Sequence, residues 1–298
     1  MTGDGQDTTG PAAPAPPRVG VVGAGAMGSG IAEVAAGAGL DVRVAVRSED
    51  SLQSGRRRLL RSVDRAMAKG RLTETERDAL LARTEFAVGL DALADRDLVV
   101  EAVREHEADK TEVFAALDKT VLAEDAILAS NTSSLPIVRL ALATARPGRV
   151  VGLHFFSPVP AMPLVELVGS PFSDEDALAR AGNFVTDVLG KRALRCPDRT
   201  GFVVNSLLIP YLLAAIRMVE QGVAPAAAVD EGMILGCSHP VGPLRLADLI
   251  GLDVVAQIAV ALHEEYDEPQ YAPPALLSRM VAGGLLGRKT GRGFYAHA

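Results

Sequence analysis

The chain is poor in aromatic side chains and in cysteine. Its 298 residues include no Trp, and aromatic residues make up only 4% of the chain. The core must therefore be built mainly from Ala, Val and Leu, which suits helices packed on a sheet. The two cysteines, Cys196 and Cys237, lie far apart. That spacing argues against a disulfide framework and is compatible with a reducing cytosol.

The chain also lacks an excess of positive charge and a long apolar run. A net charge of −7 gives no indication of a nucleic-acid or anionic-membrane partner. The arginines at 56–58 and Arg61 form a local basic patch, for which a solvated helix face is the default interpretation. No apolar run approaches the ~20 residues that span a bilayer, and the N-terminus lacks the regions of a signal peptide. We expect a cytoplasmic protein without a metal site.

The order of predicted elements indicates two domains after a short tail. Residues 1–17 carry almost no large apolar side chain and are expected to be disordered. Strands and helices alternate over residues 18–196, which predicts a doubly wound α/β domain of the Rossmann type. Helical patterns dominate residues 197–298, which predicts an all-α domain for substrate binding and dimerisation.

Local signals place several helix ends. Thr73 and Glu76 have the spacing of a capping box, which predicts a helix through about residue 82. Ser173 is the expected cap of a helix over residues 174–189. Pro210 lies inside a long apolar pattern over residues 202–221 and should kink that helix.

The glycines at 23, 25 and 28 follow a β-branched run and precede an Ala-rich amphipathic stretch. Gly23 permits a sharp turn, Gly25 lets the backbone approach a diphosphate, and Gly28 lets the helix pack closely on the strand. Free N–H groups of the helix N-terminus, at Ala26 and Met27, face the phosphates. The context favours a dinucleotide site over an ordinary Gly-rich turn.

The end of the second predicted strand bears on the choice between NAD and NADP. An acidic residue is expected there to bind the ribose of NAD, but this chain has Val46, Arg47 and Ser48. Arg47 and Ser48 could bind a 2′-phosphate through charge-assisted hydrogen bonds. The sequence thus favours NADP; in the alternative, Arg47 faces solvent and Glu49 or Asp50 holds the ribose.

Polar side chains follow later strands, at the edge where ligands bind in open α/β sheets. His154 ends a predicted strand and is the natural general acid or base. Glu166 can orient its imidazole, while Ser133 and Asn205 can hold a hydroxyl or carbonyl. Each has a plainer alternative. His154 could be a structural histidine and Glu166 a surface strand residue. Asn131 and Ser133 could cap the helix at Pro136, and the Asn205 side chain could be bonded to backbone.

Seven motifs make the sequence resemble the short-chain L-3-hydroxyacyl-CoA dehydrogenase family. The resemblance runs from Val19 to Tyr295. The motifs are VGVVGAGAMGSGIA, DLVVEAV, SNTSSLPI, GLHFFSPVPAMPLVEL, GFVVNSLLIPYL, VGPLRLADLIGLD and GRKTGRGFY. The pairing of HFFSPVPAMPLVE with SNTSS is hard to produce by chance.

The resemblance implies reversible oxidation of a 3-hydroxyacyl-CoA, such as 3-hydroxybutyryl-CoA, with a nicotinamide dinucleotide. His154 matches the catalytic base and Glu166 its partner, while Ser133 and Asn205 match residues that position substrate oxygens. Other matching positions contact the dinucleotide or CoA in the family: Glu105, Lys110, Ser133, Ser157 and Lys289 for the dinucleotide, and Ser62, Lys69 and Ser133 for CoA.

Two residues depart from the family pattern. Val46 replaces the usual ribose-binding Asp, and Ser157 replaces a common Asn. Other substrates remain open, either a 3-hydroxyacyl group on a carrier protein or a free hydroxy acid, as does a non-enzymatic role like that of the crystallin relatives. The apolar faces of the C-terminal helices predict a homodimer.

Overall fold

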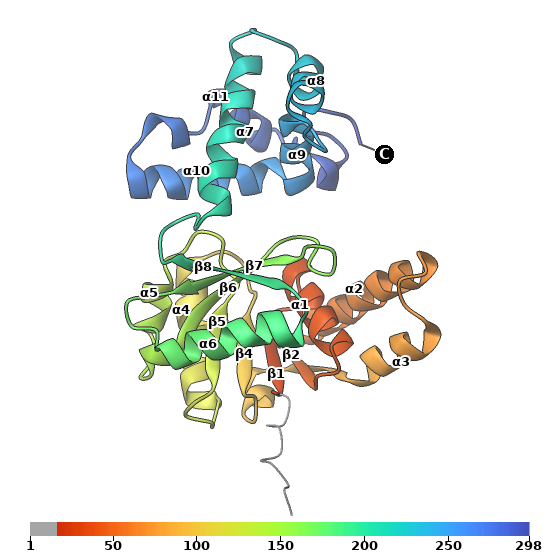
Figure 1. Ribbon diagram of the computed structural model, residues 1–298, viewed down its shortest axis with the longest axis vertical. Helices are drawn as coiled ribbons and strands as arrows, with labels where there is room; N and C mark the ends of the chain where they lie inside the picture. The colour runs from red at the N-terminus through yellow and green to blue at the C-terminus, as the bar shows by residue number, and fades with distance from the viewer. Residues whose placement is uncertain (1–16, 298) are drawn as a thin grey trace, which may run out of the picture.

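The computed structural model describes residues 17–297, so the predicted tail lies almost wholly outside the described residues. An eight-stranded sheet forms the first part of this region, in the order β3-β2-β1-β4-β5-β6-β7-β8 (Figure 1). Neighbouring strands are parallel except β6 and β7, which pair antiparallel. The strands are β1 (Val19–Val22), β2 (Val42–Val46), β3 (Thr84–Val88), β4 (Leu98–Glu101), β5 (Ile127–Ser130), β6 (Val150–Phe155), β7 (Leu164–Gly169) and β8 (Arg192–Pro197).

Helices cover both faces of the sheet. Helices α1, α2, α3 and α6 contribute to one apolar cluster and α4 and α5 to the other. Their bounds are α1 (Ala26–Gly37), α2 (Glu49–Ala68), α3 (Glu74–Ala82), α4 (Glu107–Thr120), α5 (Ile137–Ala141) and α6 (Glu175–Asn183). Strands β2 and β3 lie on one side of β1, and β4 to β8 lie on the other. This strand order confirms the predicted doubly wound Rossmann-type fold.

Helix ends follow the sequence signals in one case and depart from them in another. The capping box before α3 is present, with the Thr73 N–H donating to Glu76 over 2.8 Å. The predicted cap Ser173 is wrong. Asp174 occupies the N-cap position of α6, and the Ser173 hydroxyl instead donates to the Val150 carbonyl over 2.6 Å. After α6 the backbone continues as one π-helical turn, η3 (Phe184–Val188).

Beyond β8 the described chain is helical and has its own apolar core. Pro210 lies inside α7, and the kink expected there stays a prediction. Gly251, with φ of +106°, separates two helices that differ in direction by 96°. The helices are α7 (Val204–Glu220), α8 (Ala226–Cys237), α9 (Pro243–Ile250), α10 (Leu252–Tyr266) and α11 (Ala275–Ala282).

No single helix within residues 17–297 is both long and apolar enough to cross a bilayer; α9 and α10 meet that description only as a bent pair. Figure 1 shows the C-terminal helices gathered on one side of the sheet, with α7 leading into them. Several hydrogen bonds join the two parts, and two of them involve side chains of α10. The Tyr266 hydroxyl donates to the Thr200 carbonyl over 3.3 Å, and the Gln257 amide donates to the Glu105 carbonyl over 3.0 Å. The exact division into domains stays a prediction.

Candidate active site

The glycine turn between β1 and α1 has the shape that its sequence predicts. Gly23 has φ of +95°, and a Cβ there would lie 2.8 Å from the Ala102 carbonyl oxygen. A Cβ at Gly28 would lie 2.0 Å from the Gly23 oxygen, so the helix packs too closely for any side chain. Gly25, by contrast, faces open space, with nothing within 4 Å of an added Cβ.

The open side of this turn fits the diphosphate of a dinucleotide. Gly25 is the N-cap of α1 and offers no side chain to the first N–H groups, at Ala26 and Met27. Those donors and the positive end of the helix dipole are therefore available to an anion. The turn therefore lets the diphosphate of a nicotinamide dinucleotide come close to the backbone and offers it free N–H donors.

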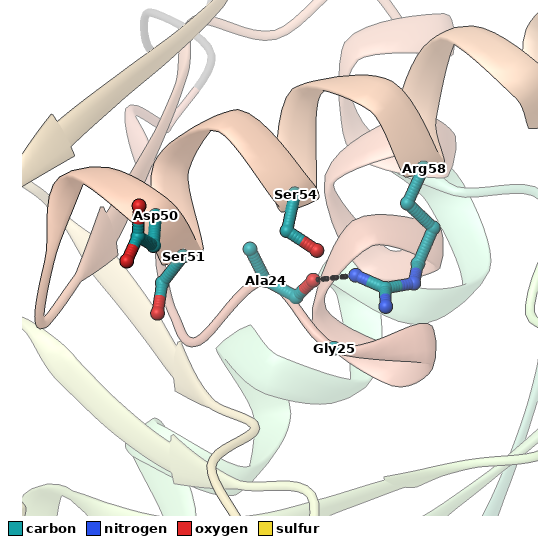
Figure 2. Close-up of a pocket in the computed structure, with 6 residues that line it drawn as sticks. All are labelled: Ala24, Gly25, Asp50, Ser51, Ser54 and Arg58. Carbon is teal, nitrogen blue, oxygen red and sulfur yellow. Dashed lines mark hydrogen bonds between the residues drawn. The ribbon is translucent and has the colours of Figure 1, made fainter.

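A cavity of about 310 Å³ lies between the glycine turn and α2, the helix that follows β2 (Figure 2). Val46 is buried, and exposed Arg47 has no ion pair among residues 17–297. The Ser48 hydroxyl accepts from the Ser51 N–H over 3.3 Å, which makes it the N-cap of α2. Glu49 accepts from a neighbouring glutamine on α2 over 2.8 Å. Asp50 lines the cavity, so a carboxylate does stand near the turn.

The clearest catalytic arrangement is a buried pair across β6 and β7. Antiparallel pairing places His154 directly opposite Glu166. The two side chains meet at 2.7 Å, from His154 Nδ1 to Glu166 Oε2, and Glu166 is fully buried. With Nδ1 bonded to the carboxylate, Nε2 is the nitrogen left to exchange a proton. The negative charge also adds to burial in raising the pKa of the neighbouring Cys196 thiol to about 12.

Glu166 also ties the sheet to the C-terminal helices. Its second oxygen, Oε1, accepts from the N–H groups of Val203 and Val204 over 2.9 and 2.8 Å, at the start of α7. The next residue is Asn205, which is 6% exposed. Its side chain makes no hydrogen bond to any residue in the described part of the chain. The same carboxylate therefore positions both the imidazole and the helix turn that carries Asn205.

Ser133 lies in a loop after β5 that is held by one carboxylate. Glu105 Oε1 accepts from the Ser133 N–H over 2.9 Å and from the Thr132 hydroxyl over 2.5 Å. Lys110 Nζ approaches Glu105 Oε2 at 3.3 Å. Burial opposes ionisation of Glu105, but Lys110 and these hydrogen bonds outweigh it, so the pKa of the Glu105 carboxyl is lowered.

Lys110 is itself fixed by a second carboxylate that the sequence did not single out. Its Nζ lies 2.7 Å from Oε1 of Glu101, and both side chains are buried. Glu101 also accepts from the Ser130 hydroxyl over 2.7 Å. Glu101 ends β4 inside the motif DLVVEAV, where a carboxylate closing a buried apolar strand is the signal that could have identified it.

Asn131 connects the Ser133 loop to the histidine strand. Its Oδ1 accepts from the Phe155 N–H over 2.9 Å, one residue beyond His154. The helix-cap alternative for Asn131 and Ser133 is wrong, because the first N–H groups of α5, at Ile137 and Val138, donate to Asp198 over 2.7 Å each. Hydrogen bonds thus connect the loops after β4 and β5 to the end of β6.

Four other predicted residues lie outside this network. Lys289 is ion-paired with Asp253 within the C-terminal helices. Ser157 is exposed after β6. Ser62 and Lys69 lie on α2 and just after its end, and Lys69 is exposed. In Figure 1, the C-terminal end of α2 extends away from the sheet.

Comparison with known sequences places both parts of the chain in one family. The sequence model described as "3-hydroxyacyl-CoA dehydrogenase, NAD binding domain" matches residues 18–199. The one described as "3-hydroxyacyl-CoA dehydrogenase, C-terminal domain" matches residues 201–297. The chain belongs to the 3-hydroxyacyl-CoA dehydrogenase family. The resemblance drawn from the motifs is therefore confirmed, and the chain is an oxidoreductase that uses a nicotinamide dinucleotide.

Similar members of the 3-hydroxyacyl-CoA dehydrogenase family come from bacteria and mammals. A 3-hydroxybutyryl-CoA dehydrogenase of Mycobacterium tuberculosis H37Rv is 56% identical over 280 residues, which cover 94% of this chain and 98% of that protein. The human mitochondrial hydroxyacyl-coenzyme A dehydrogenase is 41% identical over 288 residues, 94% of this chain and 91% of that one.

Solved structures of family members have the same architecture. The crystal structure of M. tuberculosis FadB2 has a TM-score of 0.93 at 56% identity and covers 94% of this chain and 99% of that chain. The (S)-3-hydroxybutyryl-CoA dehydrogenase of Ralstonia eutropha has a TM-score of 0.88 at 41% identity, with coverage of 94% and 99%. The Rossmann-type sheet with a helical C-terminal part is thus the architecture of the family.

Proposed function

We propose that this protein interconverts a short-chain 3-hydroxyacyl-CoA, such as 3-hydroxybutyryl-CoA, and the corresponding 3-ketoacyl-CoA. The observation that carries the proposal is the buried contact between His154 and Glu166. A 3-hydroxyl must lose its proton as its carbon loses hydride, and a neutral imidazole backed by a carboxylate suits that task. The dinucleotide, when bound at the Gly25 turn, accepts or returns the hydride.

The protein's own residues divide the remaining work. His154 takes the hydroxyl proton at Nε2, and Glu166 keeps the imidazole in the required tautomer and stabilises it when it is protonated. Ser133 and Asn205 hold the substrate oxygens by hydrogen bonds. Glu105 contributes by ordering the loop of Ser133, because it accepts hydrogen bonds from the Thr132 hydroxyl and from the N–H groups of Ser133 and Ser134.

We propose NADP(H) as the preferred cofactor. Val46 offers no carboxylate that would repel a 2′-phosphate, and Arg47 is exposed and free of ion pairs among residues 17–297. Asp50 supports the competing choice of NAD(H), because its carboxylate lines the cavity at the turn and could accept from ribose hydroxyls. Turnover with NADPH and with NADH distinguishes the two. A strong preference for NADH in the wild type, unchanged in Arg47→Ala, would rule out the assignment to NADP(H).

We propose CoA as the carrier of the acyl group, with Ser62 and Lys69 among its contacts. Lys69 is exposed at the end of α2 and has no salt-bridge partner in the described region, so its charge is available to a phosphate. Saturation by acetoacetyl-CoA at micromolar concentration supports this carrier. Activity with only a carrier-protein thioester, or with only a free hydroxy acid, would refute it.

We further propose a homodimer formed through the C-terminal helices. Large apolar side chains are exposed on three of them: Leu207 on α7 is 72% exposed, Leu235 on α8 is 75% exposed and Leu249 on α9 is 49% exposed. Burial of such side chains in a second copy would stabilise the pair. Light scattering should give twice the mass of the chain, and a monomer at micromolar concentration would exclude the dimer.

We infer a cytoplasmic location from the two cysteines. Both are free thiols, Cys196 buried and Cys237 exposed, which is typical of a reducing compartment. Recovery of the protein in the membrane or extracellular fraction would contradict this location.

The test of the proposed function is reduction of acetoacetyl-CoA by NADH and by NADPH, followed through the loss of reduced-nicotinamide absorbance. The wild type should turn over with at least one cofactor and produce 3-hydroxybutyryl-CoA. Absence of turnover with both would overturn the proposal and favour the crystallin-like alternative.

A further inference from the structure

One face of α2 presents a row of polar side chains to the glycine turn. Ser51, Ser54 and Arg58 follow one another at helical spacing and line the cavity of about 310 Å³, with Ala24 and Gly25 on its opposite wall (Figure 2). The neighbouring face of α2 is packed so tightly that a Cβ at Gly55 would lie 2.4 Å from Ala24 Cβ. The position of the row relative to the turn is therefore fixed by packing.

The Arg58 guanidinium is held at the glycine turn by a hydrogen bond to a backbone carbonyl, not by an acidic side chain. Its Nη1 donates to the Ala24 carbonyl over 2.5 Å, an oxygen that also accepts from the Ser29 hydroxyl over 3.1 Å. Figure 2 shows the guanidinium reaching from α2 to the turn above Gly25. Arg58 has no salt bridge among residues 17–297, although Asp50 lines the same cavity. A guanidinium has five N–H donors, so most of those of Arg58 have no partner among residues 17–297.

Two sources of positive potential therefore meet at Gly25. One is the N-terminus of α1, whose first N–H groups receive no side-chain cap. The other is the half-buried guanidinium of Arg58, already oriented by its bond to Ala24. A guanidinium without an acidic partner, placed beside free backbone donors and open space, is suited to bind a phosphoryl group in a bidentate manner.

Asp50 does not cancel this charge. It lies eight residues before Arg58 on α2, which is about 12 Å along a helix at ~1.5 Å per residue. The cavity thus has an acidic end at Asp50 and a basic end at Arg58. An adenosine ribose beside the first and a phosphate beside the second would match both ends.

We propose that Arg58, assisted by Ser54, binds the diphosphate of the nicotinamide dinucleotide. This inference rests on the proposed function, because it assumes that the dinucleotide lies over Gly25. A second source of phosphate is acyl-CoA, since Ser62 follows Arg58 by one turn of α2. The dinucleotide is favoured because the Arg58 guanidinium is bonded to the glycine turn itself.

The test measures the Kd of NADH, NADPH and free CoA for the intact protein and for three variants. Because the chain has no Trp, nicotinamide fluorescence reports cofactor binding with little protein background. Arg58→Gln removes the charge, Arg58→Lys keeps the charge without the planar fork, and Arg57→Gln removes an exposed charge from the adjacent position of the same helix. Thermal midpoints of all variants show whether each is folded.

For Arg58→Gln, loss of a charge-assisted hydrogen bond should raise the Kd of both NADH and NADPH by about tenfold or more. Arg58→Lys should show a smaller rise in the Kd of both cofactors. This variant also tests the assignment if Arg58→Gln does not fold. Arg57→Gln should bind both cofactors like the wild type, and the Kd of CoA should not change in any variant.

Three results would overturn the inference. If the Kd values of NADH and NADPH are both unchanged in Arg58→Gln, Arg58 does not belong to the dinucleotide site, and a rise in the Kd of CoA alone assigns it to CoA. A rise confined to NADPH would place Arg58 at the 2′-phosphate instead of the diphosphate. Failure of the proposed function is seen separately, as a wild type that neither binds the cofactors nor reduces acetoacetyl-CoA.

Discussion

Replacement of Glu166 by Gln isolates what the buried carboxylate does for the imidazole. The carboxylate accepts from His154 at 2.7 Å through one oxygen and from two N–H groups of α7 through the other. Glutamine has nearly the same shape but no charge, and its amide nitrogen cannot accept a proton. The substitution therefore removes the charge-assisted contact and permits the wrong imidazole tautomer.

The expected loss follows from the geometry. A hydrogen bond to a buried charged group is worth about 1.5–3 kcal/mol, and ~1.36 kcal/mol in the barrier changes a rate tenfold. Glu166→Gln should therefore lower kcat for acetoacetyl-CoA reduction by about 10- to 150-fold. The Kd of the cofactor should not change, because the glycine turn is formed by other residues.

The assay is steady-state reduction of acetoacetyl-CoA at saturating cofactor, together with thermal unfolding. Asp198→Asn is the matched control, because Asp198 is a half-buried carboxylate that accepts from two N–H groups at the start of α5 and has no contact with His154. Both variants should lose stability, but only Glu166→Gln should lose kcat to this extent. An equal loss of kcat in the two variants, or wild-type kcat in Glu166→Gln, would refute the reasoning.

Three further predictions concern other carboxylates. Glu105→Gln should lower kcat/KM for the thioester by about tenfold in steady-state assays, because one charge-assisted hydrogen bond of the Ser133 loop is lost; an unchanged ratio would count against this role. Burial raises the pKa of Glu33, so its carboxylate destabilises the fold at neutral pH. Glu33→Gln should therefore raise the thermal midpoint at neutral pH, and the gain should shrink as the pH falls through that raised pKa; a lower midpoint at neutral pH would disprove this. Asp248 accepts from the N–H groups of Phe294 and Tyr295 over 2.9 and 3.0 Å. Asp248→Asn should lower the unfolding free energy by about 2 kcal/mol in denaturant titration, and an unchanged value would show that these bonds are dispensable.

Much of the fold is predictable because its signals are local. The apolar run of β4, the capping box at Thr73 and the positive φ at Gly23 each depend on neighbouring residues in the chain. Family membership could also be predicted, since it depends on the same short motifs. The Ser173 cap fails because its hydroxyl is bonded to a carbonyl of β6, 23 residues earlier, and the sequence gives no sign of that contact.

The sequence predicts which side chains supply the chemistry of the site, but not the hydrogen bonds that hold them together. His154 and Glu166 can be paired in advance because the chain must turn back between them. The link from Glu166 to α7, the link from Asn131 to Phe155 and the bond from Arg58 to Ala24 join positions 24 to 38 residues apart. Arg58 was expected to be solvated with its neighbours, and only the packing of α2 on the turn distinguishes it from Arg57.

The most direct test of the account is the rate of His154→Ala with acetoacetyl-CoA under saturating cofactor, measured together with the Kd of NADH. If His154 exchanges the proton of the 3-hydroxyl, the rate should fall by about 10²- to 10⁴-fold while the Kd stays at its wild-type value. A rate close to that of the wild type would contradict the central claim that this histidine is the catalytic base.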